Sequence, residues 1–156
     1  MSFEQGATVP VAFLTAYHSL VQEARLRKGE RILIHSASGG VGLAAIQIAR
    51  RIGAEIYATA GTEDKREFLR RLGVKHVMDS RTLAFADQIM ETNGGAGVDV
   101  VLNSLAGEAI SKGLSILSDR GRFVELGKLD VLSNKRIGLL PFRNNLSFFF
   151  VDFDRL

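Results

Sequence analysis

Short apolar runs alternate with amphipathic segments along most of the chain. The apolar runs predict six β-strands, at 31–36, 55–60, 76–79, 98–103, 122–126 and 146–151. Helical spacing of apolar residues between them predicts helices at 40–52, 63–72, 82–92 and 107–117. Residues 3–25 predict one or two further helices, and 129–144 are expected to be irregular with some helix.

Strands that alternate with helices of about ten residues are typical of βαβ units and a parallel sheet. Gly53 and Gly73 stand where the first two of these helices should end. We therefore predict an α/β fold with a doubly wound, parallel, six-stranded sheet of the Rossmann type and helices on both faces. Residues 1–156 are expected to form a single dinucleotide-binding domain.

A glycine-rich turn joins the first predicted strand to the first of these helices. It runs Ala37-Ser38-Gly39-Gly40-Val41-Gly42, with Ala37 where the usual dinucleotide motif has its first glycine. We expect Gly39 to let the backbone approach a pyrophosphate and Gly42 to let the helix pack closely on the strand. The N–H groups at the helix N-terminus would then bind the phosphates. The competing interpretation is a tight turn that binds no ligand.

Composition excludes several other kinds of site. The 156 residues include no cysteine and the three histidines lack metal-binding spacing, so we expect no metal. The net charge of +3 is scattered over helices, which gives nucleic-acid binding little support. No apolar stretch reaches the roughly 20 residues of a membrane span, and no signal peptide is visible. A cytoplasmic protein with no membrane partner is expected.

The end of the second predicted strand bears on the choice between NAD and NADP. An NAD site usually places an acid there for the ribose hydroxyls, but this strand tip has none. In one interpretation the following Glu63 holds the ribose. In the other, which we favour, Thr62, Lys65 and Arg66 bind a 2′-phosphate, because a pair of cations suits a dianion. In a third, Thr62 only caps a helix and the charged side chains are solvated.

Five stretches of the chain, taken in order, resemble the cofactor domain of medium-chain dehydrogenases/reductases. They are Val11–Leu20, Lys28–Gly42, Gly61–Arg66, Gly97–Gly107 and Gly121–Asp130. The chain is most similar to the enoyl reductase domain of polyketide synthases and animal fatty acid synthase, in the quinone oxidoreductase-like group. The resemblance implies a piece of a larger reductase, because the GroES-like substrate domain of that family has no counterpart here.

The resemblance also implies a cofactor and roles for single residues. NADPH is the implied cofactor, and its 2′-phosphate is contacted by the segment that matches Thr62–Arg66. The expected cofactor-binding residues are Thr15, Ser38, Gly39, Gly40, Val41, Gly42, Thr62, Lys65, Arg66, Asn103, Ser104, Leu105 and Gly127. Lys128 and Asp154 are implied as proton donor or catalytic support, with Asp152 as the alternative partner; a simple surface ion pair is the competing interpretation.

The implied enzyme is an NADPH-dependent enoyl reductase of polyketide or fatty acid synthesis. It would transfer hydride to the β-carbon of an α,β-unsaturated acyl thioester on an acyl carrier protein. Its other expected partners are the substrate domain of the same polypeptide and, through the apolar last strand at 146–151, a second copy of the chain. Two alternatives stay open: a stand-alone NADPH:quinone oxidoreductase-like reductase, and an NADPH-binding module without catalysis of its own.

Overall fold

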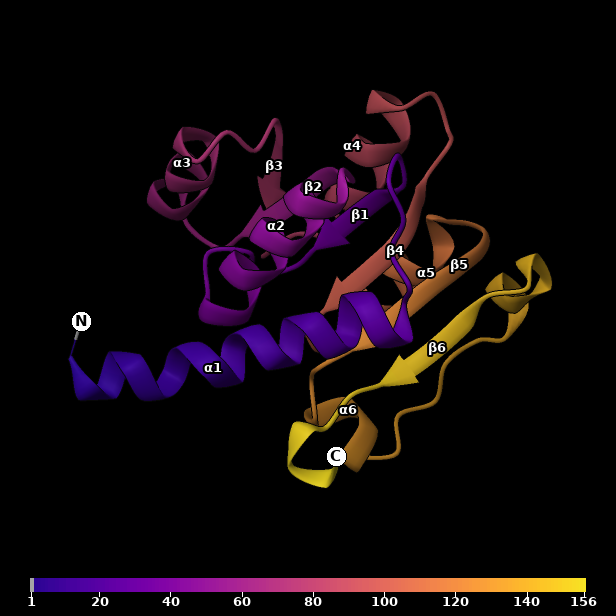
Figure 1. The fold of residues 1–156 in the computed structure, drawn as a ribbon. Helices are drawn as coiled ribbons and strands as arrows, with labels where there is room; N and C mark the ends of the chain where they lie inside the picture. The colour runs from indigo at the N-terminus through magenta and orange to yellow at the C-terminus, as the bar shows by residue number, and fades with distance from the viewer. Residues whose placement is uncertain (1) are drawn as a thin grey trace.

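A single parallel sheet forms the centre of the computed structural model, which describes residues 2–156 (Figure 1). The strand order is β3-β2-β1-β4-β5-β6, and every pair of neighbours is parallel. The strands are β1 Arg31–Ile34, β2 Glu55–Ala60, β3 His76–Asp79, β4 Val98–Asn103, β5 Leu117–Glu125 and β6 Ser147–Phe150. The order reverses between β1 and β4, which makes this the point where such sheets bind a dinucleotide.

Helices connect the strands and precede the first one. They are α1 Phe3–Tyr17, α2 Gly40–Ile52, α3 Glu63–Arg71, α4 Phe85–Thr92, α5 Glu108–Ser115 and α6 Leu129–Leu132. A π-helix covers His18–Glu23, and 3₁₀ turns cover Leu140–Asn144 and Phe153–Arg155. Gly53 ends α2 in the left-handed conformation, with φ of 92°, and its N–H donates to the carbonyls of Ala49 and Arg50.

Successive strand residues point to opposite faces of the sheet and build a core on each. Ile32 and Ile34 belong to the core that includes α1, α2 and α3 residues, whereas Leu33 belongs to the core with α4 and α5. Both faces are therefore covered by helices, as a parallel sheet requires. The predicted α/β fold, its six parallel strands and its doubly wound arrangement are confirmed.

Three strands, β1, β5 and β6, have other bounds than predicted, and β6 covers only Ser147–Phe150 of the predicted 146–151. β1 ends at Ile34 instead of residue 36, although the His35 N–H still donates to the Leu102 carbonyl. β5 begins at Leu117, which pairs with Val98 before the chain leaves the ladder and returns at Arg122. Residues 119–121, which lie between a predicted helix and a predicted strand, thus form an irregularity inside a longer strand. Periodicity misses this because the short stretch before it reads as the end of a helix.

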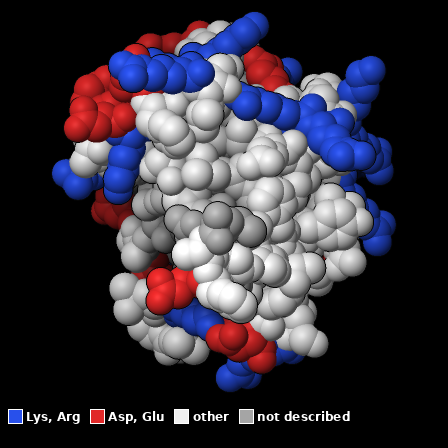
Figure 2. Space-filling model, turned by 60° about the vertical axis from the view of Figure 1, so that its left-hand side comes forward, with Lys and Arg blue, Asp and Glu red and all other residues white. Residues whose placement is uncertain are grey.

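One face carries apolar side chains that this chain does not bury. On α1 they include Val9, Val11, Phe13, Leu14 and Tyr17. Figure 2 brings this side forward and shows uncharged residues across its centre, with Lys, Arg, Asp and Glu at its margins.

Among residues 2–156, no helix combines the length and apolar character needed to cross a membrane.

Candidate cofactor site and catalytic cluster

The turn after β1 gets its tightness from Ser36 instead of from a glycine at position 37. Ser36 has φ of 49°, in the left-handed region, and the next residue, Ala37, donates its N–H to the Thr59 carbonyl of β2. Because Ser36 makes the sharp change of direction, Ala37 can occupy the first-glycine position of the motif without strain. Ala37 is fully buried between the turn and the sheet.

Gly42 lies in the closest contact of the turn. A Cβ built there would come 2.5 Å from the Ala37 Cα and 2.6 Å from the Ala37 carbonyl oxygen. Real Cβ atoms do not approach backbone so closely, so only glycine lets α2 start at this distance from the strand. This is the packing role expected of the last glycine of a dinucleotide motif.

Gly39 and Gly40 face open space instead. Gly39 has an ordinary φ of −79°, and a Cβ there would meet nothing nearer than the Ser36 carbonyl oxygen at 3.4 Å. At Gly40 the nearest atom would be the Ala12 Cβ of α1, at 3.7 Å. Neither position needs glycine for its backbone or its protein neighbours. The absent side chains leave room for a ligand to reach the backbone.

The N-terminus of α2 and a small cavity complete this central part of the site. The first bond of the helix runs from the Leu43 N–H to the Gly39 carbonyl, so the N–H groups of Gly40, Val41 and Gly42 have no intrahelical acceptor. A cavity of about 240 Å³ lies beside them. Its lining includes the glycine turn, Leu102, Ser104 and Leu126. Free N–H groups, a helix dipole and an open glycine surface fit a pyrophosphate.

Thr15 and Ser38 are the other expected residues of this part. Thr15 lies on α1, one turn after Ala12, and its Oγ1 donates to the Val11 carbonyl at 2.8 Å. Its hydroxyl is therefore already engaged within the helix. Ser38 is the residue before Gly39 in the turn.

At the end of β2, Thr62 caps α3 and Arg66 is held by other protein groups. The Thr62 Oγ1 accepts the Lys65 N–H at 3.3 Å. The Arg66 guanidinium donates to the Ala60 carbonyl at 3.0 Å and lies 3.0 Å from Glu63 and 3.4 Å from Asp79. Only 16% of its side chain is exposed. Arg66 therefore ties α3 to the ends of β2 and β3, while Lys65 is exposed and makes no ion pair within residues 2–156.

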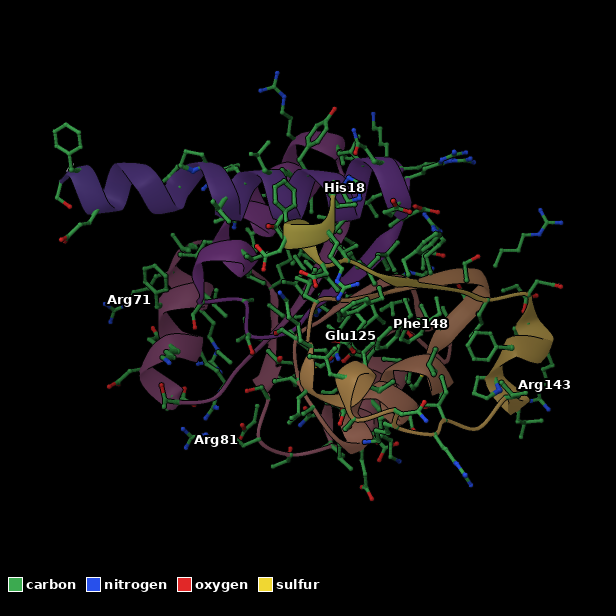
Figure 3. All side chains as sticks on the ribbon, turned by 90° about the horizontal axis from the view of Figure 1, so that it is seen from below. His18, Arg71, Arg81, Glu125, Arg143 and Phe148 are labelled. Atoms are coloured by element: carbon green, nitrogen blue, oxygen red, sulfur yellow. The ribbon has the colours of Figure 1, made fainter. Side chains whose placement is uncertain are left out.

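Arg81 is a cation that the sequence reasoning missed. It follows β3, its N–H donates to the Asp79 Oδ1 at 2.8 Å, and its side chain crosses Gly61 at the tip of β2. A Cβ on Gly61 would lie 3.1 Å from the Arg81 Nε. Figure 3 shows Arg81 at the margin of the molecule, and no ion pair engages it in the part of the chain that the structure describes. Gly61 itself was the available signal, because its φ does not require glycine.

On the other half of the sheet, a buried network joins the ends of β4 and β5. Asn103 donates its Nδ2 to Glu125 Oε2 at 2.7 Å and to the Leu105 carbonyl at 2.8 Å. The Gly127 N–H donates to Glu125 Oε1 at 2.6 Å. The expected residues Asn103, Leu105 and Gly127 are thus brought together by Glu125, which the sequence reasoning did not select. Ser104 is exposed between them and lines the cavity.

Lys128 lies between two carboxylates. Its Nζ is 2.7 Å from Asp152 Oδ1 and 2.9 Å from Asp154 Oδ2. Asp152 is the better enclosed, with 14% of its side chain exposed against 85% for Asp154. These carboxylates raise the pKa of Lys128, Asp152 first, and the lysine in turn lowers the pKa of Asp152. The structure brings together all three residues considered from the sequence, and it makes the alternative partner, Asp152, the closer one.

Comparison with known proteins agrees with this geometry. Residues 40–150 match a family described as zinc-binding dehydrogenase. The nucleotide-binding subdomain of the enoylreductase domain of PpsC from Mycobacterium tuberculosis superposes with a TM-score of 0.91 at 58% identity, covering 94% of this chain and 82% of that one. The chain belongs to the zinc-binding dehydrogenase family, and it is similar to the nucleotide-binding subdomain of an enoyl reductase. The resemblance predicted from the sequence is confirmed.

Two further relatives show how this subdomain sits in larger proteins. The crystal structure of CurK enoyl reductase is 49% identical with a TM-score of 0.88, and the match covers 99% of this chain but 46% of that one. A phenolphthiocerol/phthiocerol polyketide synthase of Mycobacterium tuberculosis is 58% identical over 150 residues. That match covers 96% of this chain, which spans about 7% of the relative's length.

The zinc in the family's description finds no fitting site in the described residues. Across 2–156, no group of three or more His, Cys, Asp or Glu side chains is placed to hold a metal ion. The chain also lacks cysteine altogether. The function proposed below assigns no step to zinc.

Proposed function

We propose that this enoyl reductase subdomain binds NADPH in preference to NADH. The observation that carries the proposal is the charge distribution at the tip of β2. Glu63, the acid that would hold the NAD ribose, is bound by Arg70 at 2.6 Å and Arg66 at 3.0 Å, and these hydrogen bonds lower its pKa. Lys65 and Arg81 are exposed and make no ion pair within the described residues. These two cations therefore remain available to a ligand, which suits a 2′-phosphate.

The reaction assigned to the parent enzyme is reduction of an α,β-unsaturated acyl thioester. The bound cofactor supplies the hydride for the β-carbon, and a proton must reach the α-carbon to give the saturated thioester and NADP⁺. Lys128, at the carboxyl end of β5, stabilises the charge that develops on the thioester oxygen or donates the proton. Asp152 and Asp154 hold its ammonium group in place.

The substrate and partners of the parent enzyme belong to the same proposal. The polyketide synthase relatives support an acyl chain on an acyl carrier protein over the quinone of a stand-alone reductase. The exposed apolar residues of α1 support contact with a substrate domain of the same polypeptide. β6 is an edge strand that pairs with β5, and its other edge supports a dimer of this chain. We also propose that the protein is located in the cytoplasm, as expected from the sequence.

Titration of the chain with NADPH and NADH, followed by nicotinamide fluorescence, tests the cofactor preference. NADPH should bind at least tenfold more tightly, and Lys65→Ala should weaken NADPH about tenfold with little change for NADH, because one charge-assisted contact is lost. Lys75→Ala, an exposed lysine at the amino end of β3, is the matched control and should change neither affinity. Equal affinities of the unmodified chain for the two cofactors would refute the preference.

A further inference from the structure

Glu125 is a buried carboxylate at the carboxyl end of β5. Its side chain is 1% exposed, and Figure 3 shows it in the interior of the molecule. The preceding residues, Phe123 and Val124, are fully buried and apolar. Within the described part of the chain, no other Asp, Glu, Lys or Arg is buried to this degree. Burying a carboxylate costs several kcal/mol unless hydrogen bonds offset it, so an apolar residue would be the cheaper way to continue the strand.

The side-chain hydrogen bonds of Glu125 go to the last residue of β4 and to the loop after β5, and to no cation. Oε1 accepts the Gly127 N–H at 2.6 Å, and Oε2 accepts the Asn103 Nδ2 at 2.7 Å. The Asn103 amide also fixes the loop after β4, because its Nδ2 donates to the Leu105 carbonyl and its Oδ1 accepts the Leu105 N–H. One carboxylate therefore sets the distance between the loop after β4 and the loop after β5.

The Glu125 carboxylate gives a reason for a glycine at position 127. Its φ lies outside the left-handed region, so its backbone does not need glycine. A Cβ there, however, would lie 2.8 Å from Glu125 Oε1. The glycine allows the short bond between its own N–H and the carboxylate. Glu125 and Gly127 thus depend on each other: the carboxylate accepts the Gly127 N–H, and the absent side chain leaves room for it.

The two loops belong to the half of the sheet that takes the second nucleotide of the cofactor. In a sheet of this order, β1 presents the pyrophosphate site and the tip of β2 the adenosine ribose, which leaves the side of β4 and β5 for the nicotinamide. Ser104 and Leu126, the residues beside Asn103 and Glu125, line the cavity at the glycine turn. The network therefore lies directly behind the cofactor-facing surface of this half.

We propose that Glu125 is a positioning residue for the nicotinamide half of the cofactor: by binding Asn103 and Gly127 it holds the two loops at the separation that this half requires. The proposal rests on the proposed NADPH site. Glu125 acts through its two partners, since its own carboxylate is enclosed. Its loss should leave the adenosine end of the site, around Lys65 and Arg81, unchanged.

The test compares two ligands that differ in the nicotinamide half. The dissociation constants of NADPH and of adenosine 2′,5′-bisphosphate are measured for the unmodified chain and for Glu125→Gln at a pH well above 7, because Glu125, whose pKa burial raises to about 7, is then a carboxylate. The amide keeps the shape of the carboxylate, but its NH₂ must face the Asn103 Nδ2 or the Gly127 N–H, and two donors then oppose each other. We expect NADPH to bind about tenfold more weakly and the bisphosphate to bind unchanged. Glu91→Gln, on the exposed side of α4, is the control and should change neither.

Each outcome decides between the proposals. Equal weakening of both ligands would overturn the positioning role, because it would indicate a general loss of structure. Unchanged binding of both ligands would also overturn it, because the loops would then hold the nicotinamide half without Glu125. Should Glu125→Gln fail to fold, Glu125→Met removes the acceptor with an apolar side chain of similar length, and intact bisphosphate binding shows that it is folded. Failure of the unmodified chain to bind NADPH would instead refute the proposed function.

Discussion

The two halves of the candidate site differ in how they use charge. The adenosine half at the tip of β2 carries exposed cations, Lys65 and Arg81, around a helix cap. The nicotinamide half at the tips of β4 and β5 buries its polar groups, Asn103 and Glu125, in a hydrogen-bonded network. An exposed cation recognises a phosphate without exact placement, because Coulomb attraction varies slowly with distance. Hydride transfer requires the two reacting atoms to be placed precisely relative to each other. A packed and fully hydrogen-bonded surface provides that precision.

The difference predicts opposite sensitivities for the two halves. Salt should screen the contribution of Lys65 and Arg81 but leave the Asn103–Glu125 bond unaffected. A conservative change of shape or of hydrogen-bonding type should matter little at the exposed cations and much in the buried network. Substitutions at the shared centre, in each half and at Lys128 test this difference.

The largest effect is expected at the centre, where both halves depend on Gly42. Gly42→Val places side-chain atoms against the Ala37 backbone, where a Cβ alone would come within 2.5 Å. We expect a loss of about 3 kcal/mol in the free energy of unfolding, measured by urea denaturation, together with loss of both NADPH and bisphosphate binding. Gly40→Ala, whose nearest neighbour would be 3.7 Å away, should lose less than about 1 kcal/mol. Equal destabilisation by the two changes would remove the packing role of Gly42.

A slightly smaller effect, confined to chemistry, is expected at Lys128. In the full-length parent enzyme, Lys128→Ala should lower turnover of a crotonyl thioester about 100-fold, since a positioned acid or charge is lost. The affinity for NADPH should stay within about twofold, because neither half of the cofactor site loses a contact. Lys75→Ala provides the charge-matched comparison. Unchanged turnover would exclude Lys128 from catalysis.

The buried half should also show a pH dependence of stability between about pH 4.5 and 7. Burial raises the pKa of Glu125 to about 7 from an ordinary value of 4.5, and the nearby Asp130 adds to the shift. Between these values the folded state holds a proton that the unfolded state has released. The free energy of unfolding should therefore fall, by on the order of 2 kcal/mol, as pH rises from about 4.5 to 7. Glu125→Gln should lose this slope; denaturation at several pH values measures it, and identical slopes would contradict the assignment.

The smallest effect is expected at Arg81, in the exposed half. Arg81→Ala should weaken NADPH and adenosine 2′,5′-bisphosphate by the same factor, about tenfold at low salt and less at high salt. This pattern is the reverse of the one expected for Glu125, where only NADPH is affected. Arg71→Ala, an exposed arginine near the end of α3, is the control. A change at Arg81 that weakened NADPH alone would place it outside the phosphate site.

Several structural features of this protein can be predicted from short stretches of its sequence. The period of the apolar residues determines the order of strands and helices, because each element must bury one face. The glycines at 42 and 53 mark a close contact and a helix end that other residues cannot adopt. Five stretches of the chain could be matched to enoyl reductases from the sequence, and the similarity to the PpsC subdomain supports that match.

Other features depend on which residues meet across distant segments. Arg81 reaches Gly61 because β3 lies beside β2, and Lys128 meets Asp152 more closely than Asp154 because the last turn encloses one carboxylate and exposes the other. A sequence position does not show burial or partners when they come from another strand. The pattern of apolar residues and glycines is therefore sufficient to predict the fold and the position of the glycine turn. The exposed cations of one half of the candidate site and the buried carboxylate of the other follow from distances between strands, which local patterns do not encode.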